Sequence, residues 1–323
     1  MDARLFRTDL DGIPTALENL ADAIESPEGA ELWPIGTPRR IVLTGMGSSY
    51  FAADVTARRL RHAGHNAVAE LASAVAGWPP SADLTMVAIS ASGATIETLN
   101  AVEPHVGISR IVALTNRAKS PITERADHTV DMLAGIEAGG VACRSFRNTI
   151  GTLLALESSL AQARPPVEVL RRAAEASQYL LESVTSSSSW LAPVLDVLDT
   201  DDGTWLLAPA ERLSSALQGA LMVREGPRRR ADGCETGDWS HVDVYLTKTL
   251  DYRAIVFPGS RYDKPAADWM RQRGARAVAV GGEFPAAEVS VRYPGDDDPL
   301  VAMLVDPLVS ELVAADWWSA QTS

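Results

Sequence analysis

Two short loops rich in glycine and serine carry the residues whose chemistry is clearest. The first, residues 45–49, follows the apolar run 41–44, and the second, residues 90–95, follows the apolar run 86–89. A strand that ends in such a loop and continues into a helix offers backbone N–H groups and hydroxyls to an anion. We therefore expect the two loops to form a single phosphate pocket. The residues expected to line it are Gly47, Ser48, Ser49, Ser90, Ser92, Gly93 and Thr95.

A dinucleotide-binding fingerprint is the main alternative for the first loop. That fingerprint needs a third glycine for close helix packing and an acidic residue about 20 positions further on for the ribose. Tyr50 occupies the place of the third glycine, and Glu70 is only a loose match for the acid. Serine and threonine also cap helices for structural reasons, which is the alternative for the second loop. The two loops together favour phosphate binding, and we expect no cofactor.

The composition is that of an ordinary globular protein. The chain has 323 residues, 46% of them hydrophobic, which is enough for two lobes. Two cysteines, Cys143 and Cys234, do not make a disulfide framework and favour a reducing compartment. The acidic N-terminal segment is unlike a signal peptide, and no run approaches the roughly 18 apolar residues of a membrane span. We therefore expect a cytoplasmic protein that does not associate with membranes.

The net charge of −13 argues against non-specific nucleic-acid binding, which needs Lys and Arg to neutralise phosphates. The one basic cluster is Arg228, Arg229 and Arg230, which is too short to reverse this balance. Its two interpretations are a solvated loop and a group beside an anionic ligand. We expect no nucleic-acid partner.

Strand-like and helix-like segments alternate along the chain, which is typical of parallel sheets covered by helices. Strands are predicted at residues 40–44, 67–71, 86–89, 111–115 and 128–131, and again at 204–208, 254–257, 277–280 and 288–291. Helices are predicted at residues 13–24, 50–63, 148–163 and 167–184, and again at 214–224, 264–274 and 300–319. A polar run at 185–189 marks a boundary. We expect an α/β fold of two tandem doubly wound parallel-sheet units, residues 1–184 and 190–323.

The loops and one later helix resemble sugar isomerase (SIS) domain proteins. The segment ISASGATIETL is similar to the SQSGET phosphate loop of that family, and GMGSSY is similar to its CGTSY loop. Residues 139–146 resemble the EIGVASTKAF element, which adds Val141 and Ala142 to the expected phosphosugar site. The helix SSALQGALMVRE, residues 214–225, is similar to the SSALEGALKLKE helix of the glucosamine-6-phosphate synthases. The resemblance covers nearly the whole chain and implies a double SIS protein that binds a phosphosugar.

In the isomerase domains of those synthases the helix ends in a glutamate that moves a proton between sugar carbons, and a histidine of a neighbouring subunit assists ring opening. The resemblance gives these roles to Glu225 and His241, whose separation of 16 residues (241 − 225) equals the family's spacing. It also implies a homodimer. A partly buried glutamate suits proton abstraction from carbon, and histidine exchanges protons near neutrality. The structural alternatives are a solvated helix end for Glu225 and a loop histidine satisfied by Asp238 or Asp243.

Departures from the synthases affect the expected substrate. Met222 replaces the lysine three residues before the glutamate, and Val242 and Asp243 replace the Gly-Pro that follows the histidine. The synthases also continue into a tail with a second catalytic lysine, which we do not expect after Ser323. Synthesis of glucosamine 6-phosphate from glutamine is therefore not expected. The chain is more similar to the fructosamine-phosphate deglycases and to the amino-sugar phosphate deaminases or isomerases.

We therefore expect an enzyme that acts on an amino- or amine-linked sugar phosphate by ring opening and proton abstraction at C1 or C2, as an isomerase, deglycase or deaminase. The alternative is a regulatory protein that binds a phosphosugar without turnover. No metal is expected, because the histidines do not form a metal-binding pattern; they are His62, His65, His105, His128 and His241. Cys143 lies near the expected pocket but lacks an acyl-transfer constellation.

Overall fold

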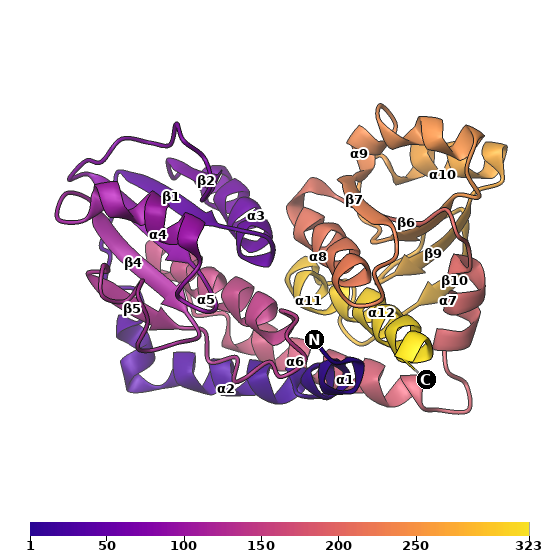
Figure 1. Cartoon of the computed structure of the whole chain (residues 1–323), viewed down its shortest axis with the longest axis horizontal. Helices are drawn as coiled ribbons and strands as arrows, with labels where there is room; N and C mark the ends of the chain where they lie inside the picture. The colour runs from indigo at the N-terminus through magenta and orange to yellow at the C-terminus, as the bar shows by residue number, and fades with distance from the viewer. Residues whose placement is uncertain (323) are drawn as a thin grey trace. The chain divides into compact units, whose positions relative to one another are not determined.

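Two parallel β-sheets of five strands each form the framework of the chain (Figure 1). The structure is a computed structural model that describes residues 1–322, without the side chains at positions 30, 31 and 322. The chain divides into two compact units. Unit 1 comprises Met1–Pro14, Glu137–Val141 and the residues from Arg172 onward, and unit 2 comprises Thr15–Ile136 and Ala142–Arg171. The predicted α/β fold with two parallel-sheet units is confirmed.

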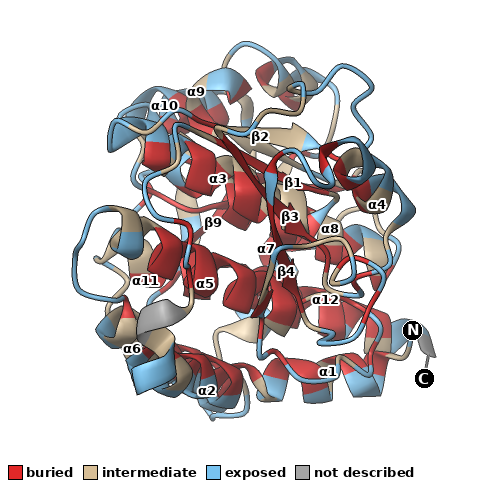
Figure 2. Cartoon of the chain, turned by 90° about the vertical axis from the view of Figure 1, so that its left-hand side faces the viewer, coloured by how far each residue is buried: buried red, intermediate tan, exposed pale blue. Residues whose placement is uncertain are grey.

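The sheet of unit 2 is wholly parallel and has the strand order β2-β1-β3-β4-β5. Its strands are β1 (Arg40–Gly45), β2 (Ala67–Leu71), β3 (Leu84–Ile89), β4 (Arg110–Thr115) and β5 (His128–Asp131). The three central strands are buried along almost their full length, and they are drawn red in Figure 2. Such continuous burial is typical of a parallel sheet that is covered on both faces.

Helices cover both faces of this sheet. They are α2 (Ile13–Glu25), α3 (Ser48–His62), α4 (Ile96–Val102) and α5 (Arg144–Leu160), with the 3-10 turns η1 (Pro27–Glu31) and η2 (Glu103–His105). Side chains alternate between the two faces of a strand. Val42 and Met86 pack with Val102 of α4 on one face, whereas Ile41 and Leu43 are buried from the other face, where α3 packs against α5.

The sheet of unit 1 is also wholly parallel and has the order β10-β9-β8-β6-β7. Its strands are β6 (Thr204–Ala208), β7 (Ala231–Glu235), β8 (Arg253–Val256), β9 (Arg276–Val280) and β10 (Ala287–Val291). In both sheets the first strand lies between the second and the third, and the fourth and fifth follow. The strand order of unit 2 is therefore repeated in unit 1.

The remaining helices belong to unit 1, except for the first five residues of α6, which are in unit 2. They are α1 (Ala3–Asp11), α6 (Val167–Val184), α7 (Leu191–Leu198), α8 (Leu213–Glu225), α9 (Thr236–Trp239), α10 (Asp263–Arg273), α11 (Pro299–Val305) and α12 (Pro307–Thr322), with the 3-10 turns η3 (Ala210–Arg212) and η4 (Asp243–Lys248). Trp239, Tyr252 and Met270 pack with Leu207 and Val256 in the core of this unit. Among the described residues, no helix is long and apolar enough to cross a membrane.

Most predicted elements have bounds close to those in the structure, and those of β2, β5, β6 and α6 agree with the prediction. The single helix predicted at residues 300–319 is wrong. Helix α11 ends at Val305 and α12 begins at Pro307, because proline lacks an N–H and clashes with the preceding turn. Strand β7 was not predicted, since its sequence ADGCE has few apolar residues. The predicted lobes, residues 1–184 and 190–323, stay a prediction.

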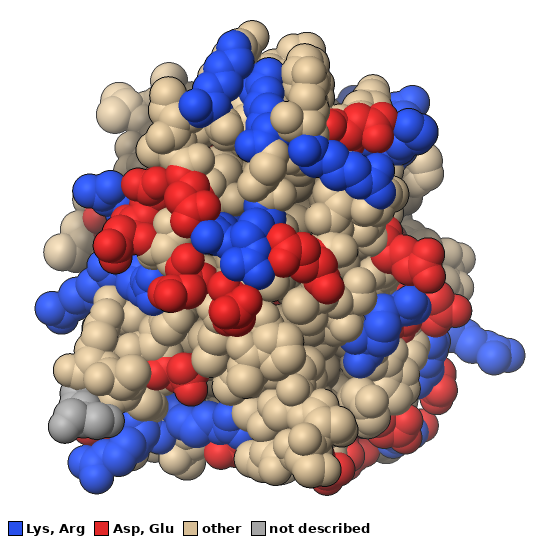
Figure 3. Space-filling view, turned by 90° about the vertical axis from the view of Figure 1, so that its right-hand side faces the viewer, with Lys and Arg blue, Asp and Glu red and all other residues tan. Residues whose placement is uncertain are grey.

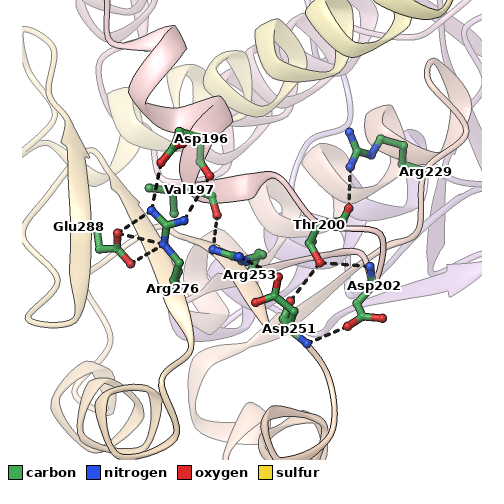
Figure 4. Close-up of polar contacts among 9 residues, drawn as sticks. All are labelled: Asp196, Val197, Thr200, Asp202, Arg229, Asp251, Arg253, Arg276 and Glu288. Atoms are coloured by element: carbon green, nitrogen blue, oxygen red, sulfur yellow. Dashed lines mark hydrogen bonds and ion pairs between the residues drawn. The ribbon is translucent and has the colours of Figure 1, made fainter.

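A network of ion pairs fixes the amino ends of the strands in unit 1 (Figure 4). Arg276 at the start of β9 donates to both carboxylate oxygens of Glu288 on β10, and to Asp196 of α7 at 3.2 Å. Arg253 at the start of β8 donates to the carbonyl oxygen of Val197 at 3.1 Å. These contacts attach α7 to β8 and β9, and Arg276 joins β10 to the same network. Basic and acidic side chains also lie next to one another across the face drawn in Figure 3.

A second charged cluster in unit 1 is buried beside the carboxyl ends of β6 and β8. The Arg212 guanidinium donates to the Asp306 carboxylate and to the carbonyl oxygen of Pro258, and the Tyr293 hydroxyl donates to Asp306. Asp306 is fully buried, and Arg212 is 6% exposed. Burial raises the pKa of Asp306 to about 6, and Arg212 opposes that rise. Each charge of this cluster is therefore stabilised by the other.

We expect Asp306→Ala to lower the free energy of unfolding by about 3–5 kcal/mol, because it leaves the buried Arg212 without its carboxylate. Asp297→Ala removes an exposed carboxylate of the same unit and serves as the control, with an expected change below about 0.5 kcal/mol. Urea denaturation followed by circular dichroism measures both changes. If the two variants unfold at the same urea concentration, the buried pair does not have this role.

Candidate functional site

The structure brings the two serine-rich loops together at the carboxyl edge of the sheet in unit 2. Strands β1 and β3 are parallel neighbours, with Thr44 opposite Ala88, and the loops begin directly beyond these residues. After β1, the chain adds β2 on one side of it and then β3 on the other side. The chain therefore has a topological switch point between β1 and β3, which is where open α/β sheets bind ligands.

The first loop leads into α3 without a side-chain cap. Gly47 is the N-cap residue, with φ +53° and ψ −128°. The N–H of Ser49 donates to the carbonyl oxygen of Met46 at 3.1 Å, and the positive end of the helix dipole favours an anion at this N-terminus. A Cβ on Gly45 would lie 2.7 Å from the Cβ of Ser49 and 3.0 Å from the carbonyl oxygen of Ile89. Glycine at position 45 therefore lets the first loop pack closely against the end of β3.

The second loop forms a tight turn held by its own hydroxyls. The Oγ of the buried Ser90 lies 2.9 Å from Oγ1 of Thr95 and accepts from the N–H of Gly93 at 3.1 Å. Ser92 is exposed, and its Oγ accepts from the N–H of Ala94 at 3.2 Å. Thr95 is the N-cap residue of α4 but makes no side-chain capping bond. The three hydroxyls thus gather before α4, where their O–H groups are able to donate to an anion.

Residues after β4 support this turn. Gly93 has φ +65°, and a Cβ there would lie 2.1 Å from Oγ of Ser120 and 3.0 Å from Oγ1 of Thr115. The carbonyl oxygen of Gly93 also accepts from the N–H of Ile122 at 3.0 Å. The sequence analysis did not identify Thr115 and Ser120. The signal that could have found them is the presence of small hydroxyl residues at the end of the strand next to β3 and in the loop that follows it.

Val141 and Ala142, expected at the same site from the family resemblance, belong to different units. Val141 is buried and ends a segment of unit 1, and Ala142 is half-buried and begins a segment of unit 2. Cys143 is the N-cap residue of α5, which begins four residues before the predicted position 148. The structure thus places Ala142 at the entry to α5, and its role in binding stays a prediction.

Glu225 is the last residue of α8, in unit 1, and is half-buried. Burial raises the pKa of its carboxyl, and Arg224 opposes this rise only in part. Within residues 1–322 its carboxylate makes no ion pair or hydrogen bond. Met222, one turn earlier, is fully buried in the core. A partly buried carboxylate of raised pKa without a partner is suited to accepting a proton.

His241 is exposed in the turn that follows α9. Its backbone N–H donates to the carbonyl oxygen of Asp238 at 2.8 Å. In the described part of the chain, no hydrogen bond or ion pair joins the imidazole to Asp238 or Glu225. The neighbouring Val242 and Tyr245 are 57% and 60% exposed. His241 therefore lies on an exposed, partly apolar segment, and the structure does not bring it into contact with Glu225.

The arginine cluster is divided between packing and solvent. The Arg229 guanidinium lies 4.1 Å from the ring centroid of Trp317 and donates to the carbonyl oxygen of Thr200 at 2.6 Å. Arg228 and Arg230 are exposed. The central arginine thus contributes to the packing of unit 1, and the two outer ones have the solvated surroundings that the charge pattern predicts.

Neither the cysteines nor the histidines form a further reactive group. Cys143 is buried, and burial together with the Asp243 carboxylate raises the pKa of the Cys234 thiol, which disfavours the thiolate. His105 is buried, with Nδ1 2.9 Å from Oγ of Ser109. Among residues 1–322, no three His, Cys, Asp or Glu side chains are grouped so that they could hold a metal ion.

Residues 35–161 match the model of the SIS domain family. The match includes both serine-rich loops and all five strands of unit 2. The isomerizing glutamine–fructose-6-phosphate aminotransferase of Sulfurisphaera tokodaii is 24% identical over 293 residues, which are 89% of this chain and 48% of the relative. The chain thus spans about half the length of this relative.

Two solved structures share the fold of the whole chain. Tagatose-6-phosphate ketose/aldose isomerase from Escherichia coli has a TM-score of 0.82 and 16% identity, covering 100% of this chain and 95% of that one. Glucosamine-6-phosphate deaminase from Thermotoga maritima has a TM-score of 0.69 and 16% identity, covering 97% and 94%. Residues 35–161 therefore match the SIS domain family, and the chain as a whole has the α/β fold of the phosphosugar isomerases.

Proposed function

We propose that this protein is an enzyme that binds an amino- or amine-linked sugar phosphate, opens its ring and abstracts a proton at C1 or C2. The observation that carries the proposal is the pair of serine-rich loops at the switch point between β1 and β3. The repeated strand order of unit 1 supports a second SIS domain beyond residue 161. The similarity to an aminotransferase named for fructose 6-phosphate supports the substrate class.

The loops bind the phosphate of the substrate. The O–H groups of Ser90, Ser92 and Thr95 donate to its oxygens, in exchange for the bond between Ser90 and Thr95. The bonds that Ser90 and Ser92 accept from the N–H groups of Gly93 and Ala94 persist, because they use the hydroxyl oxygen and leave the O–H able to donate. The N-terminus of α3 adds the positive end of its helix dipole. Ser49 and the backbone of Gly47 contribute from the first loop. Because the phosphate is remote from the reacting carbons, its binding energy positions those carbons for the proton transfer.

Glu225 is the base that moves the proton. Burial raises the pKa of its carboxyl toward neutral pH, above that of an exposed glutamate. A carboxyl of raised pKa is suited both to accepting a proton from carbon and to returning it. The assignment of Glu225 and the loops to one reaction rests on the resemblance of the helix 214–225 to the family helix and on the 16-residue spacing to His241. Met222 supplies no proton, so the reaction proceeds without the lysine of the synthases.

Two outcomes of the proton transfer are chemically balanced. In an aldose or ketose phosphate, moving a proton between C2 and C1, together with a hydroxyl proton between the oxygens on the same two carbons, isomerises the sugar and needs no other reactant. In an amino sugar phosphate, the same transfer shifts a double bond to the carbon that bears nitrogen and forms an imine. Water then adds to the imine, the C–N bond breaks, and an amine or ammonia leaves with the proton balance restored. No oxidant or reductant is required.

His241 assists ring opening in the site of a second copy of the chain, and the functional unit is a homodimer. Three observations support this part of the proposal: His241 is exposed, its imidazole has no partner in the described part of its own chain, and it is flanked by the exposed apolar side chains of Val242 and Tyr245. A two-fold dimer would cover that segment on both subunits.

A regulatory protein that binds a phosphosugar without turnover is the second candidate. The fully buried Met222 favours it, because this side chain packs in the core at the position where the synthases have a catalytic lysine. Both candidates share the phosphate site. They differ in the role of Glu225. The enzyme needs Glu225 for turnover, whereas the regulatory protein responds to its ligand without it.

We expect Glu225→Gln to slow the exchange of solvent deuterium into C1 or C2, or the release of amine, by about 10²-fold or more, because the variant lacks the base. Proton NMR in D2O measures this with fructose 6-phosphate, glucosamine 6-phosphate and fructoselysine 6-phosphate. Glu175→Gln, an exposed site on α6, is the control and should keep wild-type rates. Binding without exchange or cleavage in the wild type, for all three compounds, would support the regulatory candidate.

We expect Gly93→Ala to weaken the binding of fructose 6-phosphate, because the added Cβ would displace Ser120 and Thr115 from beneath the second loop. Gly107→Ala is the matched control. Gly107 has φ +74°, so this variant also places alanine on a left-handed backbone, but its added Cβ would have no atom within 4 Å and would cause no clash.

Both variants should lose about 1–2 kcal/mol of stability from the left-handed alanine, and Gly93→Ala about 1–3 kcal/mol more from overpacking. Isothermal titration calorimetry measures the affinity, and urea denaturation measures the stability. Equal affinities of the two variants for the sugar phosphate would count against the second loop as the phosphate site.

A further inference from the structure

Unit 2 contains a cavity of about 540 Å³ that the phosphate site does not use. Its lining comes from Thr44 of β1, Met86 of β3, the elements α4 and η2, and the segment that follows β2. The lining includes no residue of the loops 45–49 and 90–95. A volume between about 300 and 1,000 Å³ is typical of sites for small molecules.

Much of the cavity wall is apolar. Trp78, Pro79 and Pro80 line one side, and Met86 contributes from the sheet. Trp78 is half-buried and presents a large, rigid surface. These side chains would remove the apolar body of a ligand from water, which favours binding in proportion to the area covered. The wall therefore fits a ligand with an aliphatic or aromatic body.

The charge of the cavity is negative and has no positive counterpart in its lining. Glu70 at the end of β2 and Glu97 in the first turn of α4 line it, and no Lys or Arg does so among the described residues. Glu70 is half-buried. Burial raises the pKa of its carboxyl, and a hydrogen bond from the backbone N–H of Trp78 opposes that rise. A Cβ on Gly77 would lie 2.8 Å from Oε2 of Glu70, so glycine there leaves room for the carboxylate.

The nearby basic and imidazole groups do not neutralise these carboxylates. Arg40 lies with its guanidinium carbon 5.7 Å from the Trp78 ring centroid, but it forms an ion pair with Asp83 and does not line the cavity. His105 does line the cavity. Burial lowers its pKa, which favours the neutral imidazole, and its Nδ1 is engaged with Ser109. Among the described lining residues none supplies a cation to Glu70 or Glu97, and Glu70 has acceptor sites beyond the one that the backbone N–H of Trp78 uses.

We propose that this cavity binds a small organic cation, namely a primary amine with an apolar or aromatic body. The ammonium group donates hydrogen bonds to Glu70 and Glu97, and the body of the amine packs on Trp78 and the two prolines. Charge-assisted hydrogen bonds of this kind are stronger than neutral ones, and a partly desolvated carboxylate gains more from a cation than an exposed one does. The proposal does not depend on the proposed sugar chemistry.

Isothermal titration calorimetry with phenethylamine tests the proposal directly. The neutral analogue 2-phenylethanol and the anionic analogue 3-phenylpropionate have a similar body and a different charge. We expect saturable binding of phenethylamine and at least about tenfold weaker binding of both analogues. Equal affinity for the amine and the alcohol, or no saturable binding of the amine, would overturn the proposal.

Charge-removing variants locate the binding. We expect Glu97→Gln and Glu70→Gln each to weaken phenethylamine binding about tenfold. Glu124→Gln removes an exposed carboxylate of the same unit outside the cavity and should leave the affinity unchanged. Glu97 is exposed, so its variant keeps the test valid if Glu70→Gln does not fold. An equal loss in Glu97→Gln and Glu124→Gln would show a general charge effect and refute the site.

A variant of the phosphate loop separates this proposal from the proposed function. Ser92→Ala should weaken fructose 6-phosphate binding and leave phenethylamine binding unchanged, because Ser92 does not line the cavity. Failure of sugar phosphate binding together with intact amine binding would refute the proposed function alone. Loss of amine binding in Ser92→Ala would refute the independence of the cavity.

Discussion

The close approach of backbone and small side chains at the carboxyl ends of β1 and β3 is the constraint on which the candidate site depends. At Gly45 and Gly93, a Cβ would collide with neighbouring atoms, and Gly93 also has a left-handed backbone. Larger residues at these two positions would separate the loops from each other or from β4. With glycine at both positions, Oγ of Ser90 lies 2.9 Å from Oγ1 of Thr95. The positions of the loop hydroxyls at this edge thus depend on close packing between the loops and the strand ends.

The parallel sheets explain why the loops could be predicted. Strands β1 and β3 of unit 2 are buried along almost their full length, so each has a continuous apolar sequence that ends in a loop rich in glycine and serine. The same contrast predicted the repeated alternation in unit 1. Prediction was less accurate where this contrast is weak: β7 has the sequence ADGCE, and Pro307 interrupts an apolar run that otherwise has the period of one helix.

Contacts distant in sequence could not be predicted in the same way. Arg212, Tyr293 and Asp306 form a buried charged cluster, although they are separated by as many as 94 residues. Nothing in the local sequence of any one of them indicates a partner. Thr115 at the end of β4 and Ser120 beyond it support Gly93, and their hydroxyls near a strand end are the one local sign of that role. The half-buried state of Glu225 also depends on tertiary packing, because the end of a helix is exposed unless another element covers it.

The central claim is that the switch point of unit 2 holds the phosphate of a sugar phosphate. A crystal structure of the protein soaked with fructose 6-phosphate tests it most directly. The account predicts phosphate density within hydrogen-bond distance of the hydroxyls of Ser90, Ser92 and Thr95, at the N-termini of α3 and α4. An ordered ligand whose phosphate lies elsewhere, with the hydroxyls of Ser90 and Thr95 still bonded to each other, would contradict it.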